Sequence, residues 1–253
     1  MSKIISIVIV IAVLVFIVSA INNRSEKNDA KISDTNKVSP TLNTKATSTE
    51  AVLGIKIADG SYVQLHLADR KYILNPSEIS INWTGRKIIL KKWIDKGKIS
   101  LKEGSFEIKS GDIVSNSFTI DMTSIVGLST GAGSGQDKLT NHLKSADFFD
   151  VEKFPISTFI IDEIIASSTK SIYIINGKLT IKDVTNKISI PITVDTSDTK
   201  LIVIKGSVDL DRTLWNIKYG SGKFFDDLGN NVIDDMFNIS FEIKSDISKY
   251  KTE

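Results

Sequence analysis

The chain has 253 residues, 41% of them hydrophobic and 25% charged, so it can form one large or two small domains with a sizeable core. A formal net charge of +2 lacks the excess of basic residues typical of nucleic-acid-binding proteins, so no nucleic-acid partner is expected. The absence of cysteine excludes disulfides and thiolate chemistry, and neither His66 nor His142 has a second metal-type residue at ligand spacing. We therefore expect no metal site and no cofactor.

Residues 1–21 are predicted to be a signal peptide or a transmembrane anchor. Lys3 precedes an apolar run from Ile4 to Val18, which continues with few interruptions to Ile21. The run is just short of the roughly 20 apolar residues that span a membrane. Compact residues before Ala20 also suit cleavage by a signal peptidase. Both interpretations stay open, with the uncleaved anchor slightly favoured, and both place the following chain outside the cytoplasm, in the periplasm or on the cell surface.

Two segments separate this run from the main domain. Residues 22–50 are rich in Asn, Ser, Thr and Lys and have few large apolar side chains, which predicts a flexible polar linker. Residues 51–71 alternate apolar and polar residues, which indicates an N-terminal extension, interpreted as a hairpin that precedes the main domain.

The region from residue 72 to 248 is predicted to consist almost entirely of β-strands with one apolar face each. The apolar faces, in chain order, are Ile79–Ile81–Trp83, Phe106–Ile108, Phe118–Ile120–Met122, a strand from Ser171, a second from Lys178, Ile188–Ile190–Ile192–Val194, residues 200–212, and Phe237–Ile239–Phe241–Ile243. Turns are predicted at Lys109–Asp112 and Lys182–Asn186. Such strands bury their apolar faces by closing into a barrel or by stacking as a sandwich, and the periodicity allows both. Pro191 predicts a sheet edge or a bulge.

Residues 141–159, NHLKSADFFDVEKFPISTF, interrupt the strands. A short helix over residues 138–146 is predicted, capped by Asp137, after a Gly-rich loop that lacks the pattern of a phosphate-binding loop. Phe148 and Phe149 follow the helix, and adjacent residues in an extended chain face opposite ways. One ring is therefore expected to enter the barrel and the other to cover the helix or the rim, while Asp147 and Asp150 hold the turn in solvent.

The run HLKSADFFDVEKFPISTF closely resembles the signature of the YceI-like family. A second match is INGKLTIKDVTNKISIPITV, which resembles a hairpin motif of the family at Gly177, Leu179, Thr180, Val184 and Thr185. YILNPSEISINWTGRK resembles the family's opening strand. VDLDRTLWNIKYGS resembles an arginine-tryptophan segment of relatives, and this match is weaker. The resemblance covers residues 72–248. Asn75 and Asp183 replace an aspartate and a glycine common in relatives, and Trp83-Thr84-Gly85 stands where relatives carry a histidine.

The resemblance implies an all-β fold, an eight-stranded antiparallel lipocalin-like barrel with one short helix and an elongated apolar pore. It implies a non-enzymatic, extracytoplasmic protein whose partner is a long-chain isoprenoid or a similar amphiphile, with the membrane as a further partner through the N-terminal segment. The oligomeric state stays open, a homodimer being one option. The residues predicted to line the pore are Ile81, Trp83, Phe118, Ile120, Phe148, Phe149, Phe159, Leu179 and Phe241.

Two other functions stay open. A barrel filled by its own side chains would instead act as a tethered interaction or stress-response protein. A hydrolase would use carboxylates such as Asp147, Asp150 and Glu152, but these lie in a charged turn where solvation explains them better than acid-base chemistry.

Overall fold

The computed structural model describes residues 51–56, 62–67, 70–88, 94–109, 112–129, 135–167, 169, 171–195, 197–198 and 201–246. The predicted signal or anchor over residues 1–21 and the predicted linker over residues 22–50 lie outside these ranges. Within them, no helix has both the length and the apolar character needed to cross a membrane.

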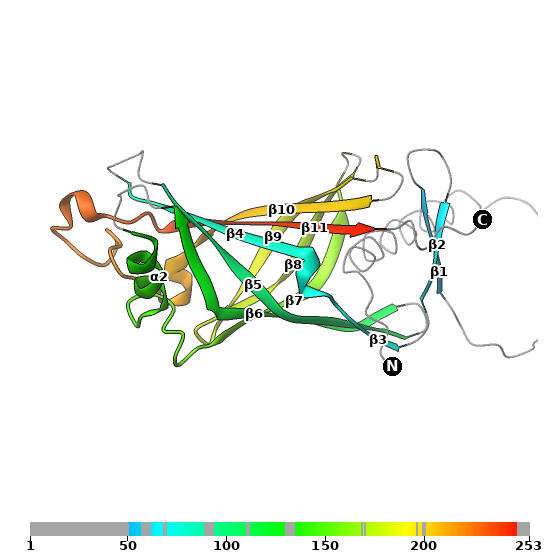
Figure 1. Cartoon of the computed structure of the whole chain (residues 1–253), viewed down its shortest axis with the longest axis horizontal. Helices are drawn as coiled ribbons and strands as arrows, with labels where there is room; N and C mark the ends of the chain where they lie inside the picture. Colours follow the sequence, from blue (N-terminus) through cyan, green and yellow to red (C-terminus); the bar gives the residue numbers. More distant parts are fainter. Residues whose placement is uncertain are drawn as a thin grey trace, which may run out of the picture.

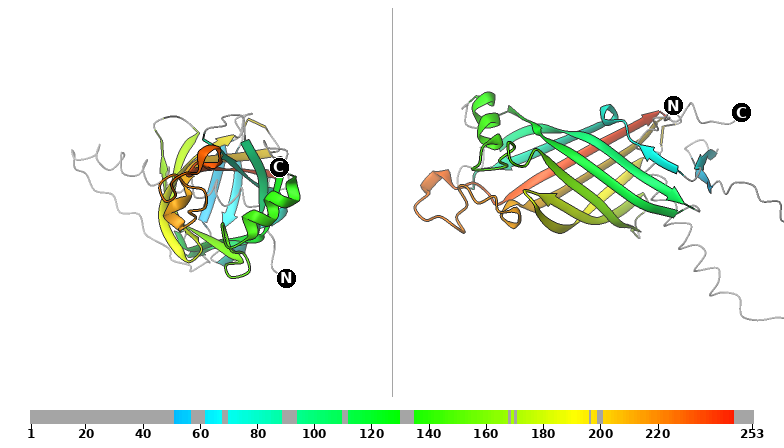
Figure 2. Two further views of the ribbon diagram at one scale, coloured as in Figure 1. Left: turned by 90° about the vertical axis from the view of Figure 1, so that its left-hand side faces the viewer. Right: turned by 90° about the horizontal axis from the view of Figure 1, so that it is seen from below.

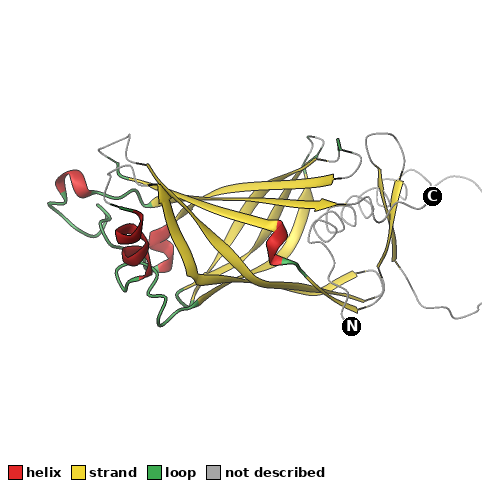
Figure 3. Cartoon of the chain, in the orientation of Figure 1, coloured by secondary structure: helices red, strands yellow, loops and turns green. Residues whose placement is uncertain are grey.

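Eight antiparallel strands close into a barrel (Figures 1 and 3). Around the barrel the order is β4-β11-β10-β9-β8-β7-β6-β5, and β5 pairs with both β4 and β6, which completes the ring. This closure confirms the predicted barrel and excludes the sandwich. The strands are β4 (Ile79–Arg86), β5 (Ile94–Lys109), β6 (Asp112–Ser129), β7 (Ile156–Ala166), β8 (Ile172–Ile181), β9 (Val184–Asp195), β10 (Leu201–Asp211) and β11 (Met236–Asp246).

Three short strands precede β4. β3 (Arg70–Ile73) pairs with the last third of β5, and β4 pairs with the first third of β5. The short helix η1 (Pro76–Glu78) connects β3 to β4. The side chain of Asn75 caps η1 by accepting a hydrogen bond from the Ser77 backbone N–H. β1 (Ala51–Lys56) and β2 (Tyr62–Leu67) form a separate antiparallel pair, seen in Figure 1 beside the barrel end opposite α2.

The hairpin between β8 and β9 differs from the prediction. Residues 172–181 form one strand, not two, because Asn176 and Gly177 continue the pairing with both neighbours. The turn is only Lys182 and Asp183, both with positive φ, at 48° and 59°. A two-residue turn of this kind matches the twist of the flanking strands, and Asp tolerates the left-handed conformation that glycine more often adopts.

Two of the eight strand pairs are joined over only part of their length. In the β6–β7 seam, Phe118–Asp121 pairs with Ile156–Phe159; in the β9–β10 seam, Ile192–Asp195 pairs with Val203–Gly206. Pro191 pairs with β8 and lies directly beyond the last β9–β10 pair, so its missing N–H removes no bond between these strands.

Side chains connect the strands where the two seams lack ladder bonds. At the β6–β7 seam, the amide of Asn116 donates to the Ile161 carbonyl at 2.8 Å and accepts from the Ile161 N–H at 2.7 Å. At the β9–β10 seam lies η2 (Arg212–Trp215), which follows β10. The Asn186 side chain of β9 donates to the Leu214 carbonyl of η2 at 2.9 Å, and the Trp215 indole donates to the Leu179 carbonyl of β8 at 3.1 Å. Trp215 is almost fully buried, so packing closes the part of this seam that lies beyond its four ladder pairs.

The helix α2 (Gln136–Lys144) lies at one end of the barrel, between the end of β6 and the start of β7 (Figure 2). Its N-cap is Gly135, without a side-chain hydrogen bond, so the prediction of Asp137 as the cap is wrong. Asp137 instead lies in the first turn, where its negative charge interacts favourably with the helix dipole. Leu143 is buried and attaches the helix to the core.

Candidate ligand-binding cavity

The barrel holds a cavity of about 1000 Å³ that extends from the α2 end past the middle of the strands, as far as Ile79, Ile175 and Ile243. Phe106, Ile192, Ile202 and Ile204 are buried at the other end and do not line the cavity, so packed side chains fill that end. Ligand pockets for small molecules usually measure ~300–1,000 Å³, so this cavity lies at the large end of the range. The barrel is therefore hollow toward α2 and solid away from it.

Aromatic rings lie against glycines of neighbouring strands in this cavity. A Cβ atom on Gly177 would come within 2.7 Å of the Phe159 ring, and one on Gly206 would overlap the ring of Phe241. The Trp83 indole covers Gly97 in the same way. Because the glycines leave room at the wall, the rings rest against the strands instead of crossing the lumen, and this pairing of small with large residues helps keep the cavity open.

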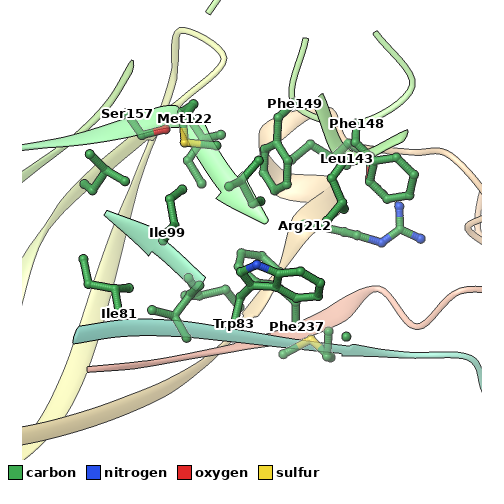
Figure 4. Close-up of a pocket in the computed structure, with 18 of the residues that line it drawn as sticks. Ile81, Trp83, Ile99, Met122, Leu143, Phe148, Phe149, Ser157, Arg212 and Phe237 are labelled. Atoms are coloured by element: carbon green, nitrogen blue, oxygen red, sulfur yellow. The ribbon is translucent and has the colours of Figure 1, made fainter. Parts of the chain in front are cut away.

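All nine residues predicted to line the pore lie on this cavity. Figure 4 labels four of them, Ile81, Trp83, Phe148 and Phe149. They come from β4, β6, β7, β8 and β11 and from the segment that follows α2. Their contact with a ligand stays a prediction. The nine are Ile81, Trp83, Phe118, Ile120, Phe148, Phe149, Phe159, Leu179 and Phe241.

Phe148 and Phe149 differ in their surroundings. Figure 4 shows their rings on opposite sides of Leu143. Phe148 is 8% exposed, and its ring centroid lies 4.9 Å from that of His142 on α2 and 5.4 Å from that of Tyr219. Phe149 is half-buried and packs beside the core cluster while facing the cavity. The Phe148 ring therefore packs between His142 of α2 and Tyr219 and holds the helix in place, whereas the Phe149 ring faces the cavity.

The end of the cavity near α2 is polar. Arg86 forms an ion pair with Asp234 at 3.0 Å, and Lys87 donates to the Asn231 side chain at 3.3 Å. Asp234 and Asn231 belong to residues 216–235, the segment between η2 and β11, which we call the rim loop. The apolar interior with a charged mouth suits a molecule with a long apolar part and a polar end.

Arg212 is buried beside the cavity but directs its donors to the rim loop. Its guanidinium donates to the backbone carbonyls of Ile217, Tyr219, Ile233 and Asp234 at 2.8–3.2 Å. Burial lowers its pKa from the ordinary value, while the carboxylates of Asp235, Asp211 and Asp234 oppose that change. Since its donors are engaged by backbone carbonyls, Arg212 holds the loop and is not available as an anion-binding group.

Two polar atoms of the cavity lining lack a hydrogen-bond partner within the described part of the chain, Trp83 Nε1 and Ser157 Oγ. Both are shielded from solvent, and an unpaired buried donor costs ~1–3 kcal/mol.

The prediction missed part of the lining. Ile125 and Ile161 continue the inward faces of β6 and β7, and Leu139 and Leu143 enter from α2. The helical pair was visible at its four-residue spacing. Ile125 was not, because the register shifts between β5 and β6 change which residues face inward. The rim loop gave no periodic signal at all.

The model of the YceI-like domain family matches residues 72–245. Among solved structures, a polyisoprenoid binding domain from Saccharophagus degradans aligns with a TM-score of 0.50 and 12% identity, covering 70% of this chain and 97% of that chain. Burkholderia cenocepacia BcnA aligns with a TM-score of 0.49 and 20% identity over 67% and 97% of the two chains. The Campylobacter jejuni YCEI protein aligns with a TM-score of 0.40 and 18% identity, covering 56% of this chain and 75% of that chain.

No curated protein matched the chain. The family match spans well over half of the sequence and coincides with the barrel. The chain therefore belongs to the YceI-like domain family.

Proposed function

We propose that this protein is a non-catalytic carrier that holds one long-chain isoprenoid or similar amphiphile in the barrel. The observation that carries the proposal is the cavity of about 1000 Å³, apolar in its depth and charged at its mouth. The Saccharophagus degradans domain with the same fold is described as polyisoprenoid binding, which supports this class of ligand.

Burial of a chain inside such a cavity is sufficient for tight binding. Each buried methylene contributes ~0.8 kcal/mol, so a chain of many carbons needs few polar contacts. The ion pair and the hydrogen bond at the mouth join the end of β4 to the rim loop. The polar end of a ligand would lie beside these groups, close to water. The ligand would then enter with its apolar end first.

The location proposed for the carrier is extracytoplasmic. The basis is the apolar run before Ile21, followed by the polar composition of residues 22–50. Membrane attachment or secretion after cleavage both fit this arrangement.

The cavity argues against a barrel filled by its own side chains. The structure gives no support to the hydrolase alternative, which needs a carboxyl group in an apolar site. Asp147 is exposed and its carboxylate lies 3.1 Å from the His142 ring, and Glu152 is exposed. We expect Asp150→Asn and Glu152→Gln to leave ligand retention unchanged. A hydrolytic activity that disappears in either variant would favour the hydrolase instead.

Mass spectrometry of the purified protein, followed by organic extraction, tests the proposal. We expect a stoichiometric long-chain lipid in the wild type and its loss in Ile239→Trp, which places a large ring in the cavity lining. The control is Ile160→Trp on β7, which is exposed and does not line the cavity. A wild-type protein that yields no lipid and takes none up from vesicles would refute the proposal.

A further inference from the structure

We propose that the rim loop docks on a lipid surface, so that the mouth of the barrel receives its ligand directly from a membrane. The inference rests on the proposed function, because it concerns how an apolar ligand reaches the cavity. It goes beyond that function in assigning a surface, residues 214–225 together with the nearby strand ends, and a partner, the lipid–water interface.

Large apolar side chains are exposed at the mouth. Phe224 and Phe225, adjacent in the rim loop, are 47% and 50% exposed, and Leu214 of η2 is 56% exposed. Neither phenylalanine lines the cavity, so ligand binding inside the barrel does not account for them. In Figure 1 the rim loop projects from the barrel beside α2, away from the remaining described residues.

The exposure is built into an ordered loop. The Gly220 carbonyl accepts from the Ile233 N–H at 2.8 Å, which ties the two arms of the loop together. Gly220 has φ +63°, and a Cβ there would press against Ile233. The Ser221 carbonyl accepts from the N–H groups of both Phe224 and Phe225 at 3.1 Å, and Ser221 itself is fully buried. The rings are thus held outward by a fixed backbone.

The strand ends beside the loop extend the apolar surface. Ile88 follows β4 and is 51% exposed, and its N–H donates to the Val232 carbonyl of the rim loop at 3.1 Å. Ile94 at the start of β5 and Leu128 near the end of β6 are also exposed. These strand ends lie at the same end of the barrel as α2 (Figure 2), so their exposed apolar residues lie at the end where the mouth opens.

The chemistry of the surface fits a membrane interface better than a dry protein contact. The Lys218 ammonium lies 4.7 Å from the centre of the Phe224 ring, a pairing that places a cation at headgroup level above a ring in the acyl region. Tyr219, exposed beside it, is amphipathic in the same sense. Asp226 and Asp227 follow directly and are exposed, which limits insertion to the headgroup boundary.

Chain length permits this orientation even for a protein anchored at residues 1–21. β3, which precedes the barrel, begins at Arg70 at the end opposite the mouth, and β6 with 18 residues is about 60 Å long. The number of residues from 22 to 50 sets an upper limit of about 100 Å on the distance they can span, which exceeds the length of β6. The mouth can therefore turn back to the membrane that holds the anchor.

Fluorescence quenching tests the docking in the full chain. Because the chain has no cysteine, Asp226→Cys gives one labelling site beside the phenylalanines, and Lys102→Cys gives a matched site on the outer wall of β5. Each labelled protein is reconstituted into phosphatidylcholine vesicles that contain a lipid-borne nitroxide quencher. We expect quenching at position 226 and none at position 102, and we expect Phe224→Ser with Phe225→Ser to abolish it.

The same double variant separates docking from ligand binding. Neither phenylalanine lines the cavity, so the amount of lipid extracted at equilibrium should match the wild type, while uptake from added vesicles should slow. Equal quenching at positions 226 and 102, or none at 226, would overturn the docking proposal. If the wild type self-associates without quenching and the double variant does not self-associate, the surface would bind a second copy of the chain, and the docking proposal would be overturned. A wild type that binds no lipid would refute the carrier function, whatever the quenching shows.

Discussion

Truncation of the two adjacent phenylalanines should separate stability from ligand binding. Phe→Ala in a packed core costs ~3–5 kcal/mol, and Phe148 meets this condition because it is 8% exposed and contacts the rings of His142 and Tyr219. Phe149 is half-buried beside a cavity that already exists, so its removal forfeits mainly transfer free energy, about 1–2 kcal/mol. With ~2–4 °C per kcal/mol for a domain of this size, Phe148→Ala should lower the Tm by about 6–20 °C and Phe149→Ala by about 2–8 °C.

The assay combines thermal unfolding with extraction of bound lipid. Phe149→Ala should change the amount or chain length of the lipid, because its half-buried ring faces the cavity. Phe148 also lines the cavity, but its ring is held between His142 and Tyr219, so Phe148→Ala should change the lipid less at temperatures where it is folded. Phe224→Ala is the matched control, since that ring is exposed and outside the cavity, and it should alter neither quantity. Equal losses of Tm, or a lipid change in Phe148→Ala alone, would refute the assignment of the two rings.

Three further predictions concern the tether and the rim loop. A chain that begins at residue 51 should be soluble and folded while the full chain partitions with membranes, which fractionation followed by circular dichroism would check; full-length protein with Met1 in the soluble fraction would contradict the anchor. Arg212→Lys should lower the free energy of unfolding by about 2–5 kcal/mol in chemical denaturation, because one ammonium cannot pair with four separate carbonyls; an unchanged midpoint would contradict this role. Burial would raise the pKa of Asp211, but hydrogen bonds from Lys223 and Thr213 outweigh it and lower the pKa below 3.8, so the stability that Asp211 contributes is present above that value and is lost as the pH falls through the folded pKa. Tm measured against pH should therefore fall more steeply below about pH 4 in the wild type than in Asp211→Asn.

The strand faces could be predicted because alternation determines them directly. Ile79, Ile81 and Trp83 in β4 all line the cavity, and so do Phe237, Ile239, Phe241 and Ile243 in β11, as the period of two requires. Closure into a barrel could not be derived in the same way, since alternation describes one strand and not its partners. The resemblance at residues 141–159 supplied that information.

Where the alternation breaks, sequence reasoning loses the side-chain direction. In β6 the inward residues are Phe118, Ile120 and Met122, and then Ile125, because the chain bulges in between. The Ser124 hydroxyl accepts from the Ser100 N–H at 2.8 Å and so replaces a ladder bond, a contact 24 residues apart in sequence. No local pattern predicts such a contact. The same holds for Arg212, whose carbonyl partners come from two separated parts of the rim loop.

The two partly joined seams divide the barrel wall into unequal pieces. Strands β7, β8 and β9 form one piece and the other five strands form the second, with four aligned residue pairs at each junction. Longer ladders join the strands within each piece, for example eleven residue pairs between β10 and β11, whereas side chains such as Asn116 and Asn186 bridge the junctions. Side-chain contacts can lengthen or re-form without loss of a strand, so the pieces can tilt apart by small amounts while each stays folded. We therefore expect the circumference of the wall to be adjustable without unfolding of either piece.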